Sequence, residues 1–164
     1  PLTKYQGGGP DAVLEPLNDH LKDYEQLMMQ YYGAGVQACY RGPRLYDTDK
    51  TRLAVRNVVN WYKKYRNILN SDIIHLRRAD GRDWDGIMHV NPELKTKALI
   101  LLFNPLKKSI TRTIRIPFYY SGLTQTVRLK EKENSFKNFT LNRNYEIELT
   151  FIIPAESYTW FVAE

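Results

Sequence analysis

Residues 144–153 read Asn-Tyr-Glu-Ile-Glu-Leu-Thr-Phe-Ile-Ile, and this stretch decides the fold of the second half of the chain. Large apolar side chains occupy every second position from Tyr145 to Ile153, and polar side chains fill most positions between them. A period of two places one face of a β-strand in a core and the other in solvent. The stretch therefore predicts a half-buried strand of an antiparallel sheet.

Further segments of the second half carry strand signals. Alternating patterns occur at residues 113–116, 126–130 and 158–162, and the continuous apolar run Ala98–Phe103 predicts a central strand. Turn dipeptides separate these segments, at Asn91-Pro92, Asn104-Pro105, Ser121-Gly122 and Ile153-Pro154. Many short strands at this spacing predict an antiparallel β-sandwich over residues 72–164.

The first 70 residues instead show the 3.6-residue period of amphipathic helices. The first helix begins near Asp11 and stops at Gly33, because Gly ends helices and Pro16 is tolerated only in a first turn. Its apolar stripe consists of Leu14, Leu17, Leu21, Tyr24, Met28 and Tyr31.

A short strand is expected between two helices. Val36–Tyr40 is apolar and is followed by the turn signal Arg41-Gly42-Pro43, so we expect a buried strand there. Asp47 or Thr48 then caps a second helix. One strand between two helices has no neighbour to pair with. Residues 1–71 should therefore belong to a barrel that is larger than this chain or pack on the sandwich, and the fold class is α+β.

The composition disfavours several classes of function. The 24 basic and 18 acidic side chains divide evenly, 12 and 9 on each side of residue 80, whereas a nucleic-acid binder concentrates basic residues on one face. The single cysteine, Cys39, excludes an intrachain disulfide and a zinc site built from cysteine pairs. No apolar run approaches the ~20 residues of a membrane span. We expect no nucleic-acid partner, no membrane association and no cofactor.

Four segments resemble parts of α-galactosidase-like glycoside hydrolases. Residues 61–72, Trp-Tyr-Lys-Lys-Tyr-Arg-Asn-Ile-Leu-Asn-Ser-Asp, are similar to the last helix of the catalytic barrel in that family. Residues 98–105, which end in an Asn-Pro turn, and residues 114–123 and 158–162 resemble strands of its C-terminal domain. The resemblance extends from about Tyr31 to the end of the chain.

The resemblance implies a domain organisation and a function. Residues 1–71 would be the C-terminal end of a (β/α)8 barrel, and residues 72–164 would form an antiparallel Greek-key β-sandwich. The parent protein would be a glycosidase that acts on a carbohydrate substrate, with the sandwich as an accessory domain packed on the barrel. The catalytic carboxylates of that family lie on middle barrel strands that are absent here. No catalytic residue is therefore assigned, and we expect the isolated chain to be inactive.

The alternative is a non-catalytic sandwich that binds carbohydrate or is purely structural. A binding module should show exposed, coplanar aromatic rings, and Tyr119, Tyr120 and Tyr145 are the candidates. Besides the substrate, the implied partners are the N-terminal remainder of the same protein and, through the apolar helix stripes, a second copy of this chain. The implied location is secreted or periplasmic.

The implied barrel geometry also selects candidate substrate-binding residues. The C-terminal ends of barrel strands face the active site, and residues 36–40 would be the last barrel strand. The candidates are Tyr40, Arg41, Arg44, Tyr46 and Asp47. Aromatic faces stack on sugar rings, and Arg and Asp side chains hydrogen-bond hydroxyl groups. The alternative is a capped turn in which Asp47 caps the helix and pairs with Arg41.

A second polar segment, Asp83-Trp84-Asp85, supplies two carboxylates and an aromatic ring. A retaining glycosidase needs two carboxyl groups about 5 Å apart, but one loop rarely supplies both. With Asp80 the segment faintly resembles a calcium loop, although the distal Glu is missing. We expect a polar interdomain loop. No metal is predicted, because His20, His75 and His89 lack metal-ligand spacing.

Overall fold

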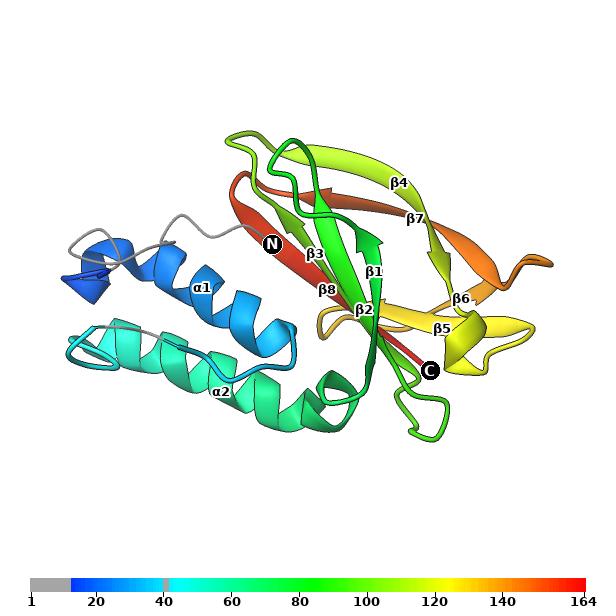
Figure 1. Cartoon of the computed structure of the whole chain (residues 1–164), viewed down its shortest axis with the longest axis horizontal. Helices are drawn as coiled ribbons and strands as arrows, with labels where there is room; N and C mark the ends of the chain where they lie inside the picture. Colours follow the sequence, from blue (N-terminus) through cyan, green and yellow to red (C-terminus); the bar gives the residue numbers. More distant parts are fainter. Residues whose placement is uncertain (1–12, 40–41) are drawn as a thin grey trace. The chain divides into compact units, whose positions relative to one another are not determined.

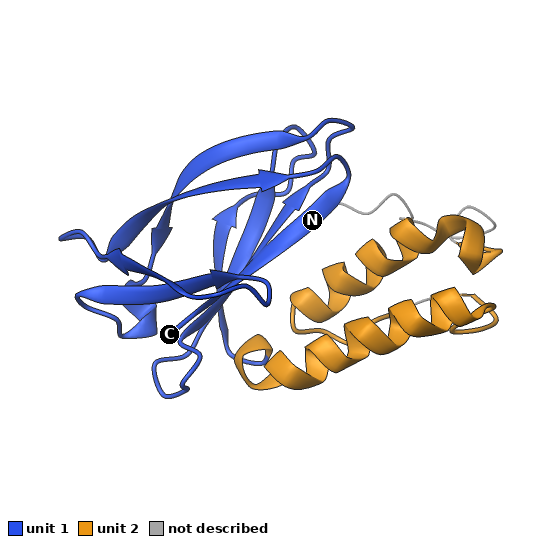
Figure 2. Ribbon diagram, turned by 180° about the vertical axis from the view of Figure 1, so that it is seen from behind, with its two compact units in different colours: residues 1–2, 70–164 blue, residues 3–69 orange. Residues whose placement is uncertain are grey.

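The structure is a computed structural model of the chain, and it describes residues 13–39 and 42–164. The chain divides into two compact units, one that ends at Leu69 and one that comprises Asn70–Glu164 (Figure 2). The boundary expected from the sequence lay between residues 71 and 72.

The first unit is built from two α-helices, α1 (Leu21–Gly33) and α2 (Asp49–Leu69), with a 3-10 turn, η2 (Leu17–His20), ahead of α1 (Figure 1). The predicted first helix thus begins later than the apolar stripe suggested. Pro16 has an extended backbone, and a proline disfavours the helical conformation of the residue before it. The helical pattern therefore cannot extend back through Pro16.

The two helices contact each other along their apolar sides. The rings of Tyr32 and Tyr62 lie 4.9 Å apart between their centroids. The Tyr24 hydroxyl donates a hydrogen bond to the Leu45 carbonyl over 2.8 Å, which fastens the connecting segment to α1. Most buried residues of α2 are separated by three, four or seven positions, which places them on one side of the helix; they are Thr51, Ala54, Val58, Tyr65, Ile68 and Leu69.

The strand predicted at Val36–Tyr40 is wrong for the part of it that the structure describes. Residues 36–39 belong to no strand, and Tyr40 lies outside the described residues. The Val36 N–H instead donates to the Tyr31 carbonyl (3.2 Å) in the turn that ends α1, where Gly35 takes a φ of 71°. A strand needs a hydrogen-bonded neighbour, and the described part of this unit offers none.

The second unit is a β-sandwich of two antiparallel sheets. Its strands are β1 (Asp72–Arg77), β2 (Asp85–Val90), β3 (Ala98–Asn104), β4 (Ile110–Pro117), β5 (Thr126–Glu131), β6 (Lys137–Thr140), β7 (Glu146–Ile153) and β8 (Ser157–Ala163), with a 3-10 turn, η3 (Tyr119–Ser121), after β4. One sheet has the order β1-β2-β3-β8-β5-β6, and the other pairs β4 with β7 (Figure 1). The predicted α+β fold with an antiparallel sandwich is confirmed.

The sandwich core contains the side chains that the alternating patterns predicted. Every second residue of β7 is buried, from Ile147 to Ile153. These side chains join one apolar cluster with residues of the six-stranded sheet, among them Met88, Ile100 and Phe161. All seven residues of β3 are buried between β2 and β8, which confirms the prediction of a central strand.

Asn104 joins the two turns at one end of the sandwich. Its buried amide nitrogen lies within 2.8–3.1 Å of the carbonyls of Lys108, Ile153 and Pro154. Its amide oxygen accepts the N–H of Leu106 over 3.0 Å. The side chain therefore binds the turn after β3 to the turn after β7, although the two are about 50 residues apart in sequence.

The start of β2 depends on a glycine. A Cβ atom on Gly86 would lie 2.7 Å from Leu102 Cδ2 and 2.8 Å from the Leu101 carbonyl oxygen. A backbone approach this close admits only glycine. It fixes the strand that follows the Asp83-Trp84-Asp85 segment tightly on β3.

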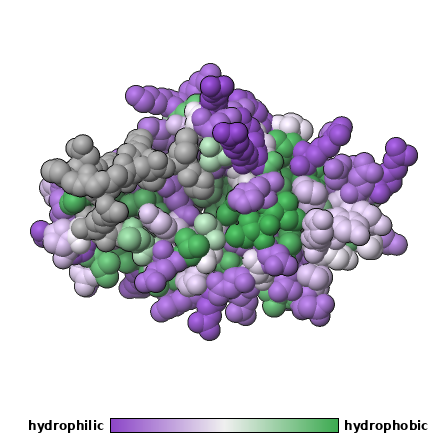
Figure 3. All heavy atoms as spheres, in the orientation of Figure 1, coloured by the Kyte–Doolittle hydropathy of each residue, from purple (hydrophilic) through white to green (hydrophobic). Residues whose placement is uncertain are grey.

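No helix among the described residues has the length and apolar content of a membrane span. Figure 3 shows hydrophilic side chains spread over the drawn face around a smaller hydrophobic area. The exposed large apolar residues of the sandwich are Ile73, Tyr119, Tyr120 and Ile152. Self-association through an apolar surface remains a prediction.

Candidate functional site

Of the five predicted substrate-binding residues, the structure describes Arg44, Tyr46 and Asp47, and all three lie in the segment before α2. Asp47 lies at its end, and both carboxylate oxygens accept hydrogen bonds within the unit. The backbone N–H of Asn18 donates to Oδ2 over 3.1 Å, and the Thr51 hydroxyl donates to Oδ1 over 3.0 Å. The carboxylate therefore fastens the start of α2 to the residues before α1.

Threonine side chains complete this cap. The Thr48 hydroxyl oxygen accepts the N–H of Thr51 over 3.3 Å, which is the hydrogen bond that an N-cap residue makes. In return, the buried Thr51 hydroxyl oxygen accepts the N–H groups of Asp47 and Thr48, each over 3.0 Å. The prediction that Asp47 or Thr48 caps the second helix is confirmed.

The electrostatics of Asp47 suit this structural role. Partial burial opposes its ionisation, but the hydrogen bonds from Asn18 and Thr51 outweigh that effect and hold the pKa of the carboxyl below its ordinary value. A carboxylate held in this way is an acceptor for donors, not a proton donor. It is therefore suited to binding hydroxyl groups or N–H groups and unsuited to general-acid chemistry.

The other candidates differ in what they offer a ligand. Arg44 Nε lies 3.4 Å from Glu15 Oε1 in an ion pair, and more than half of the Arg44 side chain is exposed. Tyr46 is 49% exposed. Tyr40 and Arg41 lie outside the described residues, so the predicted pairing of Asp47 with Arg41 stays a prediction. Substrate contact by the five residues likewise stays a prediction.

The Asp83-Trp84-Asp85 segment is held by arginines of the same unit. Asp83 accepts two hydrogen bonds from the Arg112 guanidinium, 3.0 and 3.1 Å long, and Asp80 pairs with Arg77 at 2.9 Å. The Trp84 ring packs edge-on against Phe151 in the core, with 5.9 Å between ring centroids. The two ion pairs and the buried ring give the segment a structural role in the sandwich.

The two carboxyls of this segment have opposite pKa shifts. Burial opposes ionisation of Asp83, yet the Arg112 guanidinium and the Trp84 N–H outweigh it and lower the pKa. Burial raises the pKa of Asp85, which is 2% exposed. Opposite shifts are typical of an acid and base pair. Here one carboxyl is bound by an arginine and the other is out of solvent, so neither presents a free oxygen to a sugar.

Metal binding by acidic residues finds no support among residues 13–39 and 42–164. No group of three or more His, Cys, Asp or Glu side chains there could hold an ion. Of the three carboxylates in the faint calcium-loop resemblance, Asp80 and Asp83 pair with arginines and Asp85 is buried. His89 is a buried residue of β2.

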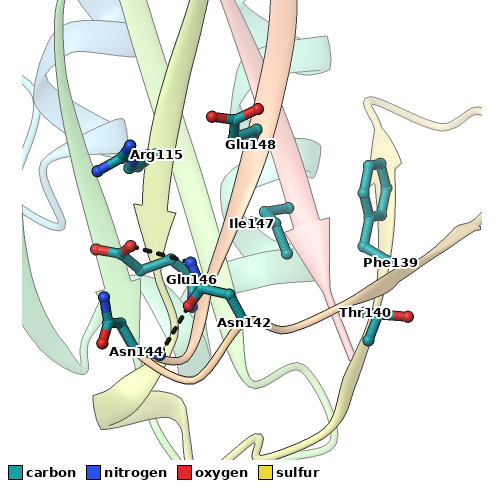
Figure 4. Close-up of a pocket in the computed structure, with 8 residues that line it drawn as sticks. All are labelled: Arg115, Phe139, Thr140, Asn142, Asn144, Glu146, Ile147 and Glu148. Atoms are coloured by element: carbon teal, nitrogen blue, oxygen red, sulfur yellow. Dashed lines mark hydrogen bonds between the residues drawn. The ribbon is translucent and has the colours of Figure 1, made fainter.

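A groove that the sequence did not predict lies at one end of the two-stranded sheet (Figure 4). Its lining comes from β4, β6, β7 and the turn between the last two, so no local pattern unites these residues. The one available signal was the exposed polar alternation of β7, which includes Glu146 and Glu148.

Comparisons with known proteins bear on the fold. No protein-family model matches the sequence, and no curated protein matches it. Among solved structures, a candidate alpha-N-acetylgalactosaminidase from Bacillus halodurans matches with a TM-score of 0.58 and 14% identity, over 87% of this chain and 31% of that one. The alpha-galactosidase I of Mortierella vinacea matches with a TM-score of 0.57 and 12% identity, over 93% and 38%.

The chain shares its fold with part of an α-galactosidase. Because the identities are this low, the likeness concerns the fold alone. The resemblance inferred from the sequence is confirmed at that level, and it covers most of this chain. The chain spans about a third of the length of the two solved structures. The activity, substrates and partners of a whole protein are therefore matters for proposal.

Proposed function

We propose that this chain is the C-terminal part of a glycoside hydrolase that acts on glycosidic bonds, with residues 72–164 as an accessory sandwich packed on a catalytic barrel. One observation carries the proposal: the fold likeness to an alpha-galactosidase and to a candidate alpha-N-acetylgalactosaminidase extends over 87–93% of this chain. A helical unit and a sandwich are matched together, which a chance likeness of one small domain would not give.

The structural roles of the Asp47 and Asp83 carboxylates support a parent protein whose catalytic carboxylates lie outside residues 1–164. Asp47 fastens a helix start, and Asp83 is bound by Arg112. Hydrolysis of a glycosidic bond by the common two-carboxylate mechanism requires an acid and a second carboxylate that flank the bond. In this proposal the catalytic pair belongs to the remainder of the parent protein, and residues 1–164 alone are inactive.

The proposed substrate is a carbohydrate with an α-linked terminal sugar, after the enzymes named in the two matching structures. The test is to assay the protein as its gene encodes it against aryl α-galactoside and aryl N-acetyl-α-galactosaminide, with residues 1–164 as a parallel sample. Turnover by the whole protein and none by residues 1–164 is expected. No turnover of any aryl glycoside by the whole protein would overturn the proposal.

Residues 1–164 need a control of their own. If they turn over substrate, and if Asp83→Asn or Asp85→Asn removes that activity, the segment at residues 83–85 is an active site and the placement of the catalytic carboxylates outside residues 1–164 is wrong. The accessory role predicts that deleting residues 72–164 from the whole protein lowers its yield and melting temperature. A rise in KM that is confined to polymeric substrates would indicate a binding module instead.

A secreted or periplasmic location is part of the same proposal, since polysaccharide substrates lie outside the cytoplasm. Fractionation of the source cells, with activity as the readout, tests this location. Activity confined to the cytoplasmic fraction would contradict it.

A further inference from the structure

The groove at one end of the two-stranded sheet is large enough for a small ligand. It is open to solvent, has a volume of about 480 Å³ and is lined by Arg115, Phe139, Thr140, Asn142, Asn144, Glu146, Ile147 and Glu148 (Figure 4). Ligand sites of soluble proteins are typically some 300–1,000 Å³. The groove lies where the chain crosses from β6 in one sheet to β7 in the other, so both sheets contribute to it.

The turn that forms the groove wall is rigidly built. Asn142 Oδ1 accepts the N–H groups of Asn144 (2.8 Å) and Glu146 (3.0 Å), and the Asn142 carbonyl accepts the N–H of Tyr145 (2.9 Å). The Tyr145 carbonyl accepts the N–H of Phe118 over 2.7 Å, which ties the turn to the segment after β4. The wall is therefore fixed before any ligand binds.

Tyr145 takes a backbone conformation that a bulky side chain rarely adopts. Its φ is 60°, in the left-handed region where glycine or asparagine is the usual residue. Strain of this kind persists where the surrounding structure imposes it, and it concentrates at functional sites. The conformation brings the Tyr145 ring to 5.6 Å from the Tyr119 ring.

Tyr145 of this turn and the two tyrosines of η3, Tyr119 and Tyr120, thus form an aromatic cluster. The rings of Tyr119 and Tyr120 meet edge to face at 90°, with 5.2 Å between centroids, and each residue is more than 60% exposed. The rings are not coplanar, which differs from the flat platform expected of a binding module. An edge-to-face pair still leaves ring faces open, and an aromatic face packs against the apolar face of a sugar ring.

The polar lining mixes both charges with amides. Arg115 lies opposite Glu148 in the β4–β7 ladder, and Glu146 follows the turn. Arg115 makes no ion pair or side-chain hydrogen bond among the residues that the structure describes. Guanidinium and amide N–H groups donate while carboxylates accept, so the lining matches a ligand whose groups do both. Hydroxyl groups have this property, whereas an anion would meet two carboxylates.

We infer that the groove beside the β6–β7 turn, together with the cluster of Tyr119, Tyr120 and Tyr145, binds a neutral oligosaccharide. The groove holds hydroxyl groups through Arg115, Asn144 and Glu148, and the tyrosine faces pack on a sugar ring beside it. This binding does not depend on whether the parent protein is a glycoside hydrolase, because it is argued from the groove and the tyrosine cluster of the sandwich. A failure of the activity assay above would leave it standing.

The test is a chemical-shift titration of the ¹⁵N-labelled chain of residues 1–164 with maltotriose, cellotriose and raffinose, and with a heparin tetrasaccharide as the charged probe. At least one neutral trisaccharide should shift the amide signals of residues 139–148 saturably. Two variants should weaken that binding about 3- to 10-fold, the range of one lost aromatic or hydrogen-bonding contact. They are Arg115→Ala in the groove and Tyr145→Gly, which removes the ring while keeping the turn.

Ile152→Thr is the matched control, because Ile152 lies on the same exposed face of β7 near the far end of the strand. It should leave the affinity unchanged. The inference is overturned if no neutral trisaccharide gives saturable shifts at residues 139–148, or if only the heparin tetrasaccharide binds. It is also overturned if Arg115→Ala and Tyr145→Gly bind as tightly as Ile152→Thr.

Discussion

The turn after β3 and the turn before β7 are both built around an asparagine, Asn104 in the first and Asn142 in the second. Asn104 is fully buried, and its amide bonds the backbone of two distant turns. Asn142 is exposed and bonds only the backbone of its own turn, together with the side chain of Glu146. An asparagine side chain thus connects two distant turns at Asn104, whereas at Asn142 it stabilises only its own turn.

The difference shows how structural and ligand-binding turns can be distinguished in this fold. At Asn104 the polar groups of the side chain face inward, although the turn after β7 that it joins also contains a residue of positive φ, Glu156 (48°). At Asn142 the backbone is satisfied locally, Tyr145 carries positive φ, and the neighbouring polar and aromatic groups face solvent. Local strain together with outward chemistry is typical of a functional site. The following predictions test this distinction, in order of decreasing effect.

Replacing Asn104 by Ala should give the largest loss of stability. The substitution leaves buried carbonyls and the Leu106 N–H without their partner, and each unsatisfied buried group costs roughly 1–3 kcal/mol. We expect the free energy of unfolding to fall by about 2–4 kcal/mol, measured by urea denaturation. Asn138→Ala, at an exposed position of β6, is the control. Equal losses in the free energy of unfolding for the two variants would mean that Asn104 does not stabilise the two turns.

Replacing Asn142 by Ala should cost less, about 1 kcal/mol, because water can reach the N–H groups that lose their acceptor. The same denaturation experiment measures it. Because the turn positions the groove wall, the amide signals of residues 139–148 should also shift while the rest of the sandwich stays unchanged. A loss as large as that of Asn104→Ala would contradict the proposed contrast between the two turns.

Tyr145 offers a direct measure of the strain. Tyr145→Ala and Tyr145→Gly both remove the ring, but only glycine relieves the left-handed conformation. We expect the Gly variant to be the more stable of the two by about 0.5–1 kcal/mol, after allowance for the greater entropy of glycine in the unfolded chain. An Ala variant as stable as the Gly variant would show that the turn relaxes when the ring is removed, and that the ring imposes the strain.

Much of the fold was predictable because buried apolar residues recur in the sequence with the period of the strand or helix that contains them. The five strands predicted from apolar patterns correspond to β3, β4, β5, β7 and β8. Three strands, β1, β2 and β6, were missed. Most residues of the edge strands β1 and β6 are exposed or half-exposed and carry no clear alternation. The strand β2 is buried, but Asp85, Gly86 and His89 interrupt its apolar pattern. The failed strand at Val36–Tyr40 shows the reverse error, because an apolar run without a neighbouring strand cannot form a ladder.

The candidate site was less predictable than the fold. The residues near Asp47 were selected through the family resemblance, and the sequence could not reveal that Thr51, inside a helix, would hold that aspartate. The groove could not be predicted from the sequence for a different reason. Its polar residues come from segments up to 33 positions apart, Arg115 to Glu148, and only the ladder register brings these two together. Contacts set by tertiary structure leave no local pattern.

The smallest predicted effect concerns the ion pair of Asp83 with Arg112, which braces the segment before β2. Both side chains are roughly one-third exposed, so solvent screens the pair, and Asp83→Asn should cost only about 0.3–1 kcal/mol at neutral pH. The folded pKa of Asp83 lies below its ordinary value of 3.8, so the folded state binds the proton more weakly than the unfolded state. The stabilisation is therefore complete above about pH 4–5 and is lost as the pH falls through the folded pKa.

The free energies of unfolding of the unmodified chain and of Asp83→Asn, measured by denaturation, should differ at pH 7 and converge at the acid end. Glu133→Gln, which removes the half-exposed carboxylate that pairs with Lys130, should show a smaller difference at pH 7. A difference for Asp83→Asn that persists unchanged in acid would mean that its effect comes from the hydrogen bond to the Trp84 N–H and not from charge.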